Sequence, residues 1–371
     1  MRIVCAPDSF KESMSALQAA RAMGLGVHDA LPDAECVLAP MSDGGEGFTD
    51  AIGQAWDAEA VEVDTLDALG RPIRAAYRLA EDRAVLDVAS CSGLELIAPQ
   101  DRRIERANTR GLGILIRDAL SRGARSLLIG IGGTATNDAG AGMLVALGAR
   151  LLDAGGAEVR PSPLELSRVV RVDDSALARL FEGVEVRVAS DVTNPLCGPE
   201  GASAVFGPQK GLAPKDVPAF DAALHAFARA SGRPDLAERP GSGAAGGLGF
   251  ALRAFLGAEL VPGLDLDLVA EALGLAEAIE GADLVLTGEG KVDGQSARGK
   301  TPVGVAALAG GLGVPVLLFA GALGDGAEAL LDVGATRIIA ISMPDEPLPV
   351  ALRRGPENLR HAVAAALRQS R

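Results

Sequence analysis

The apolar positions of the chain alternate between two kinds of segment. Short aliphatic runs, such as residues 3–6 and 36–38, predict buried strands, and the Ala-rich stretch from Ser15 to about Leu31 has the spacing of a helix. A strand, a helix and a second strand in this order predict a βαβ unit. The same order returns near the C-terminus, where strands are expected at 284–286, 314–320 and 337–341. Crossover helices between such strands favour a doubly wound parallel sheet built from both chain ends.

The middle of the chain has a different pattern. Alternating residues at 73–77 and 83–89 predict an antiparallel hairpin, followed by a helix from Thr109 to Ser121. Further strands are expected at 126–129, 184–189 and 201–206. This mixture of antiparallel and parallel elements predicts an α+β domain that differs from the parallel sheet of the chain ends.

The length of 371 residues also predicts two domains. Turn-rich segments near residues 64–71 and 257–263 bound the middle part. We therefore expect a discontinuous α/β domain from residues 1–62 and 258–371, with an inserted α+β domain at 63–257.

Composition narrows the classes of function. Hydrophobic residues make up 48% of the chain, so it can build sizeable cores. The net charge is −14 and the sequence has no basic stripe that could neutralise a phosphate backbone, so we expect no nucleic-acid partner. The cysteines are widely spaced and lack a cluster of histidines, which favours neither disulfides nor a zinc site. The N-terminus lacks an apolar signal region, and no run reaches the roughly 18 apolar residues of a membrane span. We expect a cytoplasmic protein with small-molecule partners and no membrane contact.

Several predicted strands end in small residues followed by an acid. Because the carboxyl ends of parallel strands surround the ligand crevice of such sheets, these loops are expected to converge. Each acid alone is also typical of an ordinary turn or helix cap. The candidate acids are Asp8, Asp43, Asp138, Asp191 and Glu289.

Lysines are few, and several lie beside these turns. Lys11, Lys210, Lys291 and Lys300 each follow a glycine-rich or strand-end segment. This placement indicates anion binding, although a single lysine is more often a solvated surface charge. Covalent catalysis is not indicated, because no Ser-His-Asp or Cys-His set can be assembled.

Two known nucleotide motifs match the chain. Residues 294–301 fit G-x-x-x-x-G-K-[ST], but a P-loop starts directly after its strand, and residue 294 lies well beyond the strand at 284–286. Residues 130–135 fit G-x-G-x-x-A, with an acid at Asp153, as in dinucleotide-binding enzymes. An NAD-dependent oxidoreductase acting on a small hydroxy acid is therefore the alternative function, and a two-domain solute-binding module is a third class.

Several long motifs occur along the chain, and they are APDSFKES at 6–13, SDGGEG at 42–47, GGTATNDAG at 132–140, SDVTNPLCG at 190–198, FGPQKG at 206–211, GAAGGLG at 243–249, TGEG at 287–290 and GKTP at 299–302. Together these motifs resemble those of the bacterial type I glycerate kinases. They occur in the same order as in that family, from the first residues to about Ser342.

This resemblance implies ATP-dependent phosphorylation of D-glycerate on its 2-hydroxyl, with magnesium. It also implies a flavodoxin-like domain, an inserted second domain and an active site in the crevice between them. Asp191 is the expected catalytic base, and Asp43 and Asp138 are the expected magnesium ligands, although carboxylates could exchange these roles.

The remaining site residues are assigned to the two substrates. Asp8, Ser9, Lys11 and Asn194 are expected to bind glycerate, and Lys11 is also counted with Asp43 and Asp191 in the catalytic set. The residues expected to bind the nucleotide or its phosphates are Gly44, Gly45, Gly132, Gly133, Thr134, Gly288, Glu289, Gly290 and Lys300.

Overall fold

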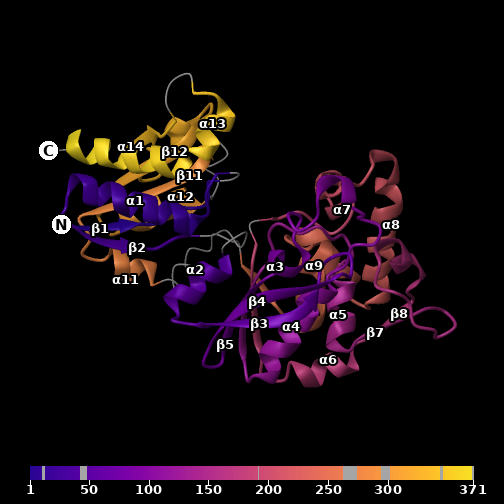
Figure 1. The fold of residues 1–371 in the computed structure, drawn as a ribbon. Coiled ribbons are helices and arrows are strands. Elements are labelled where there is room, and N and C mark those ends of the chain that lie inside the picture. Colours follow the sequence, from indigo (N-terminus) through magenta and orange to yellow (C-terminus); the bar gives the residue numbers. More distant parts are fainter. Residues whose placement is uncertain are drawn as a thin grey trace. The chain divides into compact units, whose positions relative to one another are not determined.

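The chain divides into two compact units (Figure 1). Unit 1 comprises Met1–Asp43, Asp50–Trp56 and Leu264–Arg371, and unit 2 comprises Gly44–Thr49 and Asp57–Gly263. The computed structural model describes residues 1–10, 13–41, 48–190, 192–261, 274–293, 301–342 and 346–369.

Unit 1 contains a parallel sheet in the order β13-β12-β11-β1-β2. In chain order this is the 2-1-3-4-5 arrangement of flavodoxin-like folds. The predicted doubly wound parallel sheet from both chain ends is therefore confirmed. Its strands are β1 (Arg2–Cys5), β2 (Glu35–Leu38), β11 (Leu284–Val292), β12 (Val316–Leu323) and β13 (Arg337–Ala340).

Helices cover both faces of this sheet. On one face, α1 and α14 lie side by side, and Arg360 donates two hydrogen bonds to the Asp29 carboxylate between them (Figure 1). On the other face, Val303 of α12 packs with Leu318 and Ala320. The helices of this unit are α1 (Ala16–Ala30), α2 (Phe48–Ala55, whose first two residues belong to unit 2), α11 (Leu275–Ile279), α12 (Thr301–Gly311), α13 (Leu348–Arg353) and α14 (Gly355–Gln369).

Unit 2 contains a mixed sheet in the order β10-β9-β6-β5-β4-β3. Strands β10, β9, β6 and β5 are parallel, and β4 pairs antiparallel with both β5 and β3. The predicted hairpin is therefore present as β4 and β5. The strands are β3 (Glu59–Leu66), β4 (Pro72–Ala80), β5 (Arg83–Asp87), β6 (Ser126–Gly130), β9 (Glu185–Ala189) and β10 (Glu259–Val261), with a small separate pair β7 (Arg150–Leu152) and β8 (Arg171–Asp173).

The core of unit 2 lies between this sheet and its helices. Leu112, Leu115 and Ile116 form the buried face of α4, which repeats every three to four residues as an amphipathic helix requires. Phe227 of α8 and Phe250 of α9 meet edge to face in the same core. The helices are α3 (Ala89–Ser92), α4 (Arg110–Ser121), α5 (Ala141–Leu147), α6 (Ser175–Leu180), α7 (Ala202–Phe206), α8 (Val217–Ala230) and α9 (Ala244–Leu256).

The prediction of a strand at residues 201–206 is wrong, because this segment forms helix α7. The Val205 N–H bonds to the Gly201 carbonyl, as in a helical turn, and the sheet position beside β9 is taken by β10. The domain boundaries also shift. Residues 59–62 belong to β3, which pairs with β4 along its whole length, so they join unit 2. Strand β10 pairs with β9, so residues 259–261 also join unit 2 rather than the discontinuous α/β domain.

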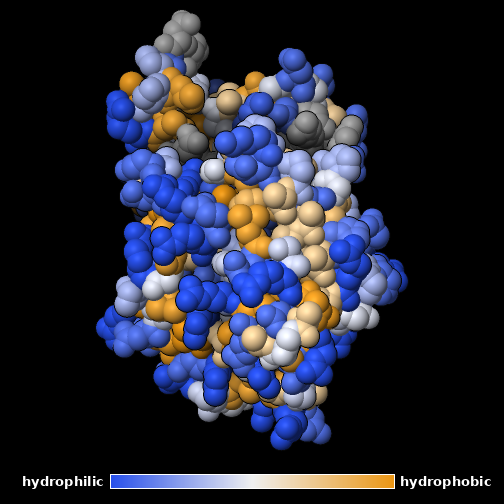
Figure 2. All heavy atoms as spheres, turned by 90° about the vertical axis from the view of Figure 1, so that its right-hand side faces the viewer, coloured by the Kyte–Doolittle hydropathy of each residue, from blue (hydrophilic) through white to orange (hydrophobic). Residues whose placement is uncertain are grey.

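Figure 2 shows one face of the molecule, where hydrophilic side chains surround smaller apolar patches. Among the described residues, no helix combines the length and apolar character needed to cross a bilayer.

Candidate active site

The first candidate cluster lies at the carboxyl ends of β1 and β11 in unit 1. Asp8 follows β1, and its backbone N–H donates to the Gly288 carbonyl of β11 at 2.9 Å. Its Oδ2 accepts a hydrogen bond of 2.7 Å from Thr301 Oγ1 at the start of α12. The chain turns to opposite sides of β1 at this point, since β2 flanks it on one side and β11 on the other. Open α/β sheets bind their ligands at such a switch point.

Neighbouring residues of this cluster also come from the predicted site. Ser9 donates its backbone N–H to Asp8 Oδ1 at 2.6 Å, and Glu289 is 7% exposed on β11. Thr287, the residue before Gly288 in β11, donates its hydroxyl to the Ala6 carbonyl. The structure therefore brings Asp8, Ser9 and Glu289 to one edge of the parallel sheet.

Gly288 has a structural reason to be glycine. A Cβ atom at this position would lie 2.2 Å from the Phe319 carbonyl oxygen of β12. Glycine thus allows two strands to approach closely, which is a different use from the predicted approach of backbone to a phosphate.

The second cluster lies at the carboxyl ends of β5, β6 and β9 in unit 2. Asp87 ends β5 opposite Gly130 of β6, and the Ile131 N–H bonds to the Ala189 carbonyl of β9. The next residue, Ser190, is 8% exposed. Three parallel strands thus end side by side, and Asp191 follows directly in the sequence.

Lys210 holds the loop that leaves β6. Its side chain is buried, and Nζ donates to the Thr136 carbonyl at 2.7 Å and to Thr134 Oγ1 at 3.1 Å. Burial lowers the pKa of Lys210 to about 7, although the negative charge of Asp138 opposes this shift. The ammonium therefore supports the loop from inside, which differs from the anion contact expected for this lysine.

Asp138 is fully buried, and both of its oxygens accept hydrogen bonds. Oδ2 accepts from the Thr109 N–H, the Thr109 hydroxyl and the Gly142 N–H, each at 2.9 Å, and Oδ1 accepts from the Gly140 N–H at 3.3 Å. Burial raises the pKa of Asp138, and these bonds act in the opposite direction. The geometry favours a structural carboxylate that joins the start of α4 to the start of α5. It does not fit the magnesium ligand expected at this position, because a ligand needs an accessible lone pair.

The glycine-rich segment at the start of α9 packs against the same loop. Gly246 has a positive φ of 68°, and a Cβ there would lie 2.0 Å from the Thr136 carbonyl oxygen. The Gly243 N–H donates to the Asn194 carbonyl at 2.9 Å, while the Asn194 side chain donates to the Glu200 carbonyl. Four sequence motifs, at 132–140, 190–198, 206–211 and 243–249, therefore meet in unit 2.

Gly132, Gly133 and Thr134 precede this buried part of the loop. Gly133 is exposed with a φ of 69°, whereas Thr134 is buried against Lys210. The G-x-G-x-x-A match does not continue as a dinucleotide motif, because α5 begins only at Ala141, well after Ala135. The helix of that motif should begin within the glycine run.

Gly290, also predicted to bind the nucleotide, lies in β11. Six predicted site residues and most of the P-loop-like segment 294–301 lie outside the described residues. These site residues are Lys11, Asp43, Gly44, Gly45, Asp191 and Lys300.

Asp87 and Thr49 were missed by the sequence analysis. Thr49 donates its hydroxyl to Asp87 Oδ2 at 2.7 Å, and the Ser90 N–H donates to Oδ1 at 2.6 Å. Asp87 ends a buried strand, which is the same signal that selected the other acids. This carboxylate lies beside the loop after β6 and completes the strand-end cluster of unit 2.

Small polar residues and carboxylates at the carboxyl ends of parallel strands are typical of α/β proteins that bind small polar ligands. Comparisons with known proteins identify the family. A model described as the glycerate kinase family matches residues 3–371. The glycerate kinase of Halalkalibacterium halodurans is 42% identical over 365 residues, covering 97% of this chain and 96% of that protein. The glycerate 2-kinase of Escherichia coli is 40% identical over 375 residues, covering 99% and 98%.

The same relationship is found among solved structures. A crystal structure of a Salmonella typhimurium LT2 protein described as a glycerate kinase 2 is 40% identical, with a TM-score of 0.86. The match covers 100% of this chain and 98% of that chain. The chain belongs to the glycerate kinase family, as the sequence motifs predicted.

Proposed function

We propose that this chain transfers the γ-phosphoryl group of ATP to the 2-hydroxyl of D-glycerate, giving 2-phosphoglycerate and ADP. The observation that carries this proposal is the full-length match to the family, including 40% identity to a glycerate 2-kinase over 99% of the chain. The two strand-end clusters support it, because both gather the residue types that bind small polar ligands at the edge of a parallel sheet.

Phosphoryl transfer requires alignment of the hydroxyl with the phosphorus and stabilisation of charge on the phosphate oxygens. In the proposed step the 2-hydroxyl oxygen bonds to the γ-phosphorus, the bond to the ADP oxygen breaks, and Asp191 accepts the hydroxyl proton. Asp191 is the second residue after the end of β9 in the sequence, and Ser190 and Asp87 mark the strand ends of unit 2.

Unit 1 supplies the other group of proposed contacts. Asp8 and Ser9 are proposed to contact glycerate, with Lys11 as the cation for its carboxylate. Glu289 and Lys300 are proposed to contact the nucleotide. The Thr301 hydroxyl fixes the Asp8 carboxylate from the start of α12, so Asp8 is oriented before substrate binds.

Magnesium is expected with ATP, because it neutralises charge on the transferred phosphate. Of its two predicted protein ligands, Asp138 does not fit, since its oxygens are buried and hydrogen-bonded. Among the residues described by the structure, no group of three or more His, Cys, Asp or Glu side chains could hold a metal ion.

The test is a coupled assay with enolase, which consumes 2-phosphoglycerate. The protein with ATP, magnesium and D-glycerate should support product formation through enolase alone. A product that enolase accepts only after addition of phosphoglycerate mutase would be 3-phosphoglycerate and would contradict the proposed position. Absence of ADP formation with glycerate would contradict the activity.

The role of Asp191 is tested by Asp191→Asn. This variant should keep its affinity for ADP and lose turnover by about 10²–10⁴-fold, as expected when a general base is removed. Asp216→Asn is a matched control, because Asp216 is an exposed acid of unit 2 whose side chain forms no capping hydrogen bond at the start of α8. Near-normal turnover of Asp191→Asn would remove Asp191 from the role of base.

A further inference from the structure

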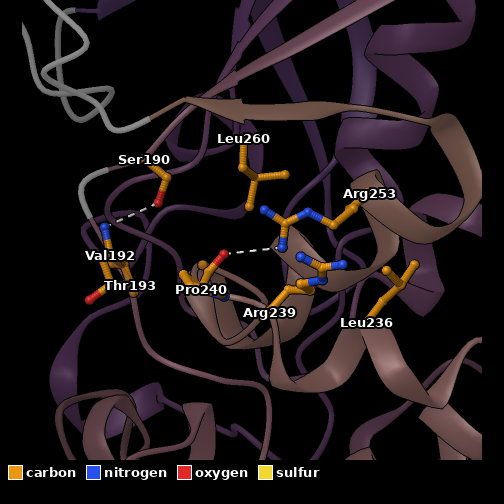
Figure 3. A pocket seen from close by; sticks show the side chains of 9 residues that line it. Ser190, Val192, Thr193, Leu236, Arg239, Pro240, Arg253 and Leu260 are labelled. Atoms are coloured by element: carbon orange, nitrogen blue, oxygen red, sulfur yellow. Dashed lines mark hydrogen bonds between the residues drawn. The ribbon is translucent and has the colours of Figure 1, made fainter.

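A pocket in unit 2 includes residues that no motif selected. It has a volume of about 460 Å³ and lies at the carboxyl ends of β9 and β10 (Figure 3). Ser190 and Thr193 line one side, and Leu260 of β10 and Leu236 line others. The pocket is therefore lined in part by Ser190, Val192 and Thr193 of the 190–198 motif.

Two arginines lie in this pocket. Figure 3 shows the guanidinium groups of Arg239 and Arg253 near each other, close to Pro240 and Leu260. Arg253, on α9, donates Nη1 to the Pro240 carbonyl at 3.0 Å and to Ser242 Oγ at 3.1 Å. These bonds hold its guanidinium in a fixed position.

Arg239 is different, because its side chain forms no hydrogen bond or ion pair with the described part of the chain. No carboxylate is found among the described residues that line the pocket. Burial lowers the pKa of Arg253, and the neighbouring charge of Arg239 lowers it further. The exposed Arg239 and the partly buried Arg253 thus place two like charges near each other with no carboxylate among the described lining residues, in a chain whose net charge is −14.

An oxyanion would relieve this repulsion. Arginine presents a planar fork of N–H donors that matches phosphate and carboxylate oxygens, and such charge-assisted bonds are about twice as strong as neutral ones. We propose that Arg239 and Arg253 form an oxyanion subsite that binds the phosphates of the nucleotide substrate. The proposal rests on the proposed function, to which it adds a binding site for one substrate.

The size and lining of the pocket favour the nucleotide over glycerate. A volume of about 460 Å³ is within the range of about 300–1,000 Å³ typical of sites for larger organic ligands. A three-carbon acid would fill only a small part of it. The aliphatic side chains of Leu236 and Leu260 add apolar surface that could pack against a sugar or a base. Glycerate has neither group.

The test compares binding of ADP with binding of D-glycerate, each titrated separately by calorimetry against the full-length protein. Arg239→Gln should weaken ADP binding about tenfold or more and leave glycerate binding unchanged. Arg253→Lys, which keeps the charge but removes the fork, should weaken ADP binding to a smaller extent. Arg160→Gln is the matched control, since Arg160 is an exposed arginine of unit 2 outside the pocket.

Circular dichroism melts verify that each variant is folded; Arg239→Gln should melt like the wild type because its side chain has no described partner to lose. Wild-type affinity for ADP in folded Arg239→Gln and Arg253→Lys would overturn the proposal, and so would weakened glycerate binding in place of weakened ADP binding. The proposed function is tested independently, because the enolase-coupled assay uses the wild-type protein and does not depend on either arginine variant.

Discussion

The Thr301 hydroxyl donates a hydrogen bond of 2.7 Å to Asp8 Oδ2, although the two residues are 293 positions apart in the chain. Both are buried. This bond joins the start of α12 to the loop after β1. Segments from the N-terminal and C-terminal parts of the chain therefore fix one carboxylate at the carboxyl end of β1 in unit 1.

Thr301→Val keeps the shape of the side chain and removes this donor. We expect the free energy of unfolding of unit 1 to fall by about 1–3 kcal/mol, because a buried carboxylate oxygen loses a hydrogen bond. Trp56, the single tryptophan of the chain, belongs to unit 1, so its fluorescence during urea unfolding is the measurement. Thr301→Ser retains the hydroxyl and should lose less. Equal losses in both variants would show that the methyl group, and not the bond, is responsible.

Asp138→Asn distinguishes a structural carboxylate from a metal ligand. The asparagine would place an NH₂ group against N–H donors that now bond to a carboxylate oxygen, so we expect a loss of about 2–4 kcal/mol in the free energy of unfolding. The magnesium concentration for half-maximal kinase activity should stay the same in the folded variant. A large rise in that concentration, with little loss of stability, would restore Asp138 as a metal ligand.

Lys210 should give unit 2 a pH-dependent stability. Its pKa is about 7 in the folded state and about 10.4 in an unfolded chain. Between these values the unfolded chain binds the additional proton, so the free energy of unfolding rises with pH, by at most about 1.4 kcal/mol per pH unit. Below about pH 7 both states are protonated and this contribution is constant.

The measurement is urea unfolding of the wild type and Lys210→Met, followed by circular dichroism from about pH 6 to pH 10. The wild type should gain stability relative to the variant as the pH rises. Lys215→Met changes an exposed lysine and should track the wild type. Parallel profiles for the wild type and Lys210→Met would contradict the lowered pKa.

Gly246→Ala should disrupt the packing of α9 on the loop after β6. The alanine would be strained by the positive φ of 68°, and its Cβ would lie 2.0 Å from the Thr136 carbonyl oxygen. Gly257→Ala is a matched control, since its φ is 65° and no atom lies within 4 Å of the added Cβ. We expect about 1 kcal/mol of destabilisation for Gly257→Ala and clearly more for Gly246→Ala. Equal thermal stabilities would mean that the close approach carries no cost.

The thiol of Cys36 should react first with iodoacetamide. Cys36 Sγ lies 3.5 Å from Cys5 Sγ, and the hydrogen bond from Cys5 lowers the pKa of Cys36. Burial raises the pKa of Cys91 and of Cys197 to about 12. Mass spectrometry of native protein after brief alkylation should find Cys36 modified before Cys91 and Cys197. Modification of Cys91 first would contradict this order.

The parallel sheet of unit 1 could be predicted because its signals are local. Helix α1 begins where Ser15 and Gln18 form a capping box, and each strand is a short aliphatic run between helices. Strand β10 and helix α7 could not be separated in this way. Residues 201–206 and 259–261 are both short segments that contain aliphatic residues, and only the packing of the sheet decides which segment pairs with β9.

The candidate site was predictable only in part. An acid after a buried strand selected Asp8 and Asp138 equally, yet Thr109 reaches Asp138 from 29 positions away and makes it structural. That contact has no local signature. No sequence motif selected Arg239 and Arg253. They lie on the two sides of a glycine-rich run that has no charge pattern, and α9 and the loop before it bring them to one pocket.

The pairing of β1 with β11 has a consequence for how the protein is made. These strands are separated by roughly 280 residues, which a ribosome adding about 5–20 residues per second needs on the order of 15–60 s to synthesise. Most of unit 2 is contiguous in sequence and is synthesised between these two strands. Unit 2 can therefore fold before β11 is available to pair with β1 in the sheet of unit 1. A nascent chain stalled before residue 284 would carry a folded insert and an apolar, incomplete sheet, which is the species that chaperones should bind.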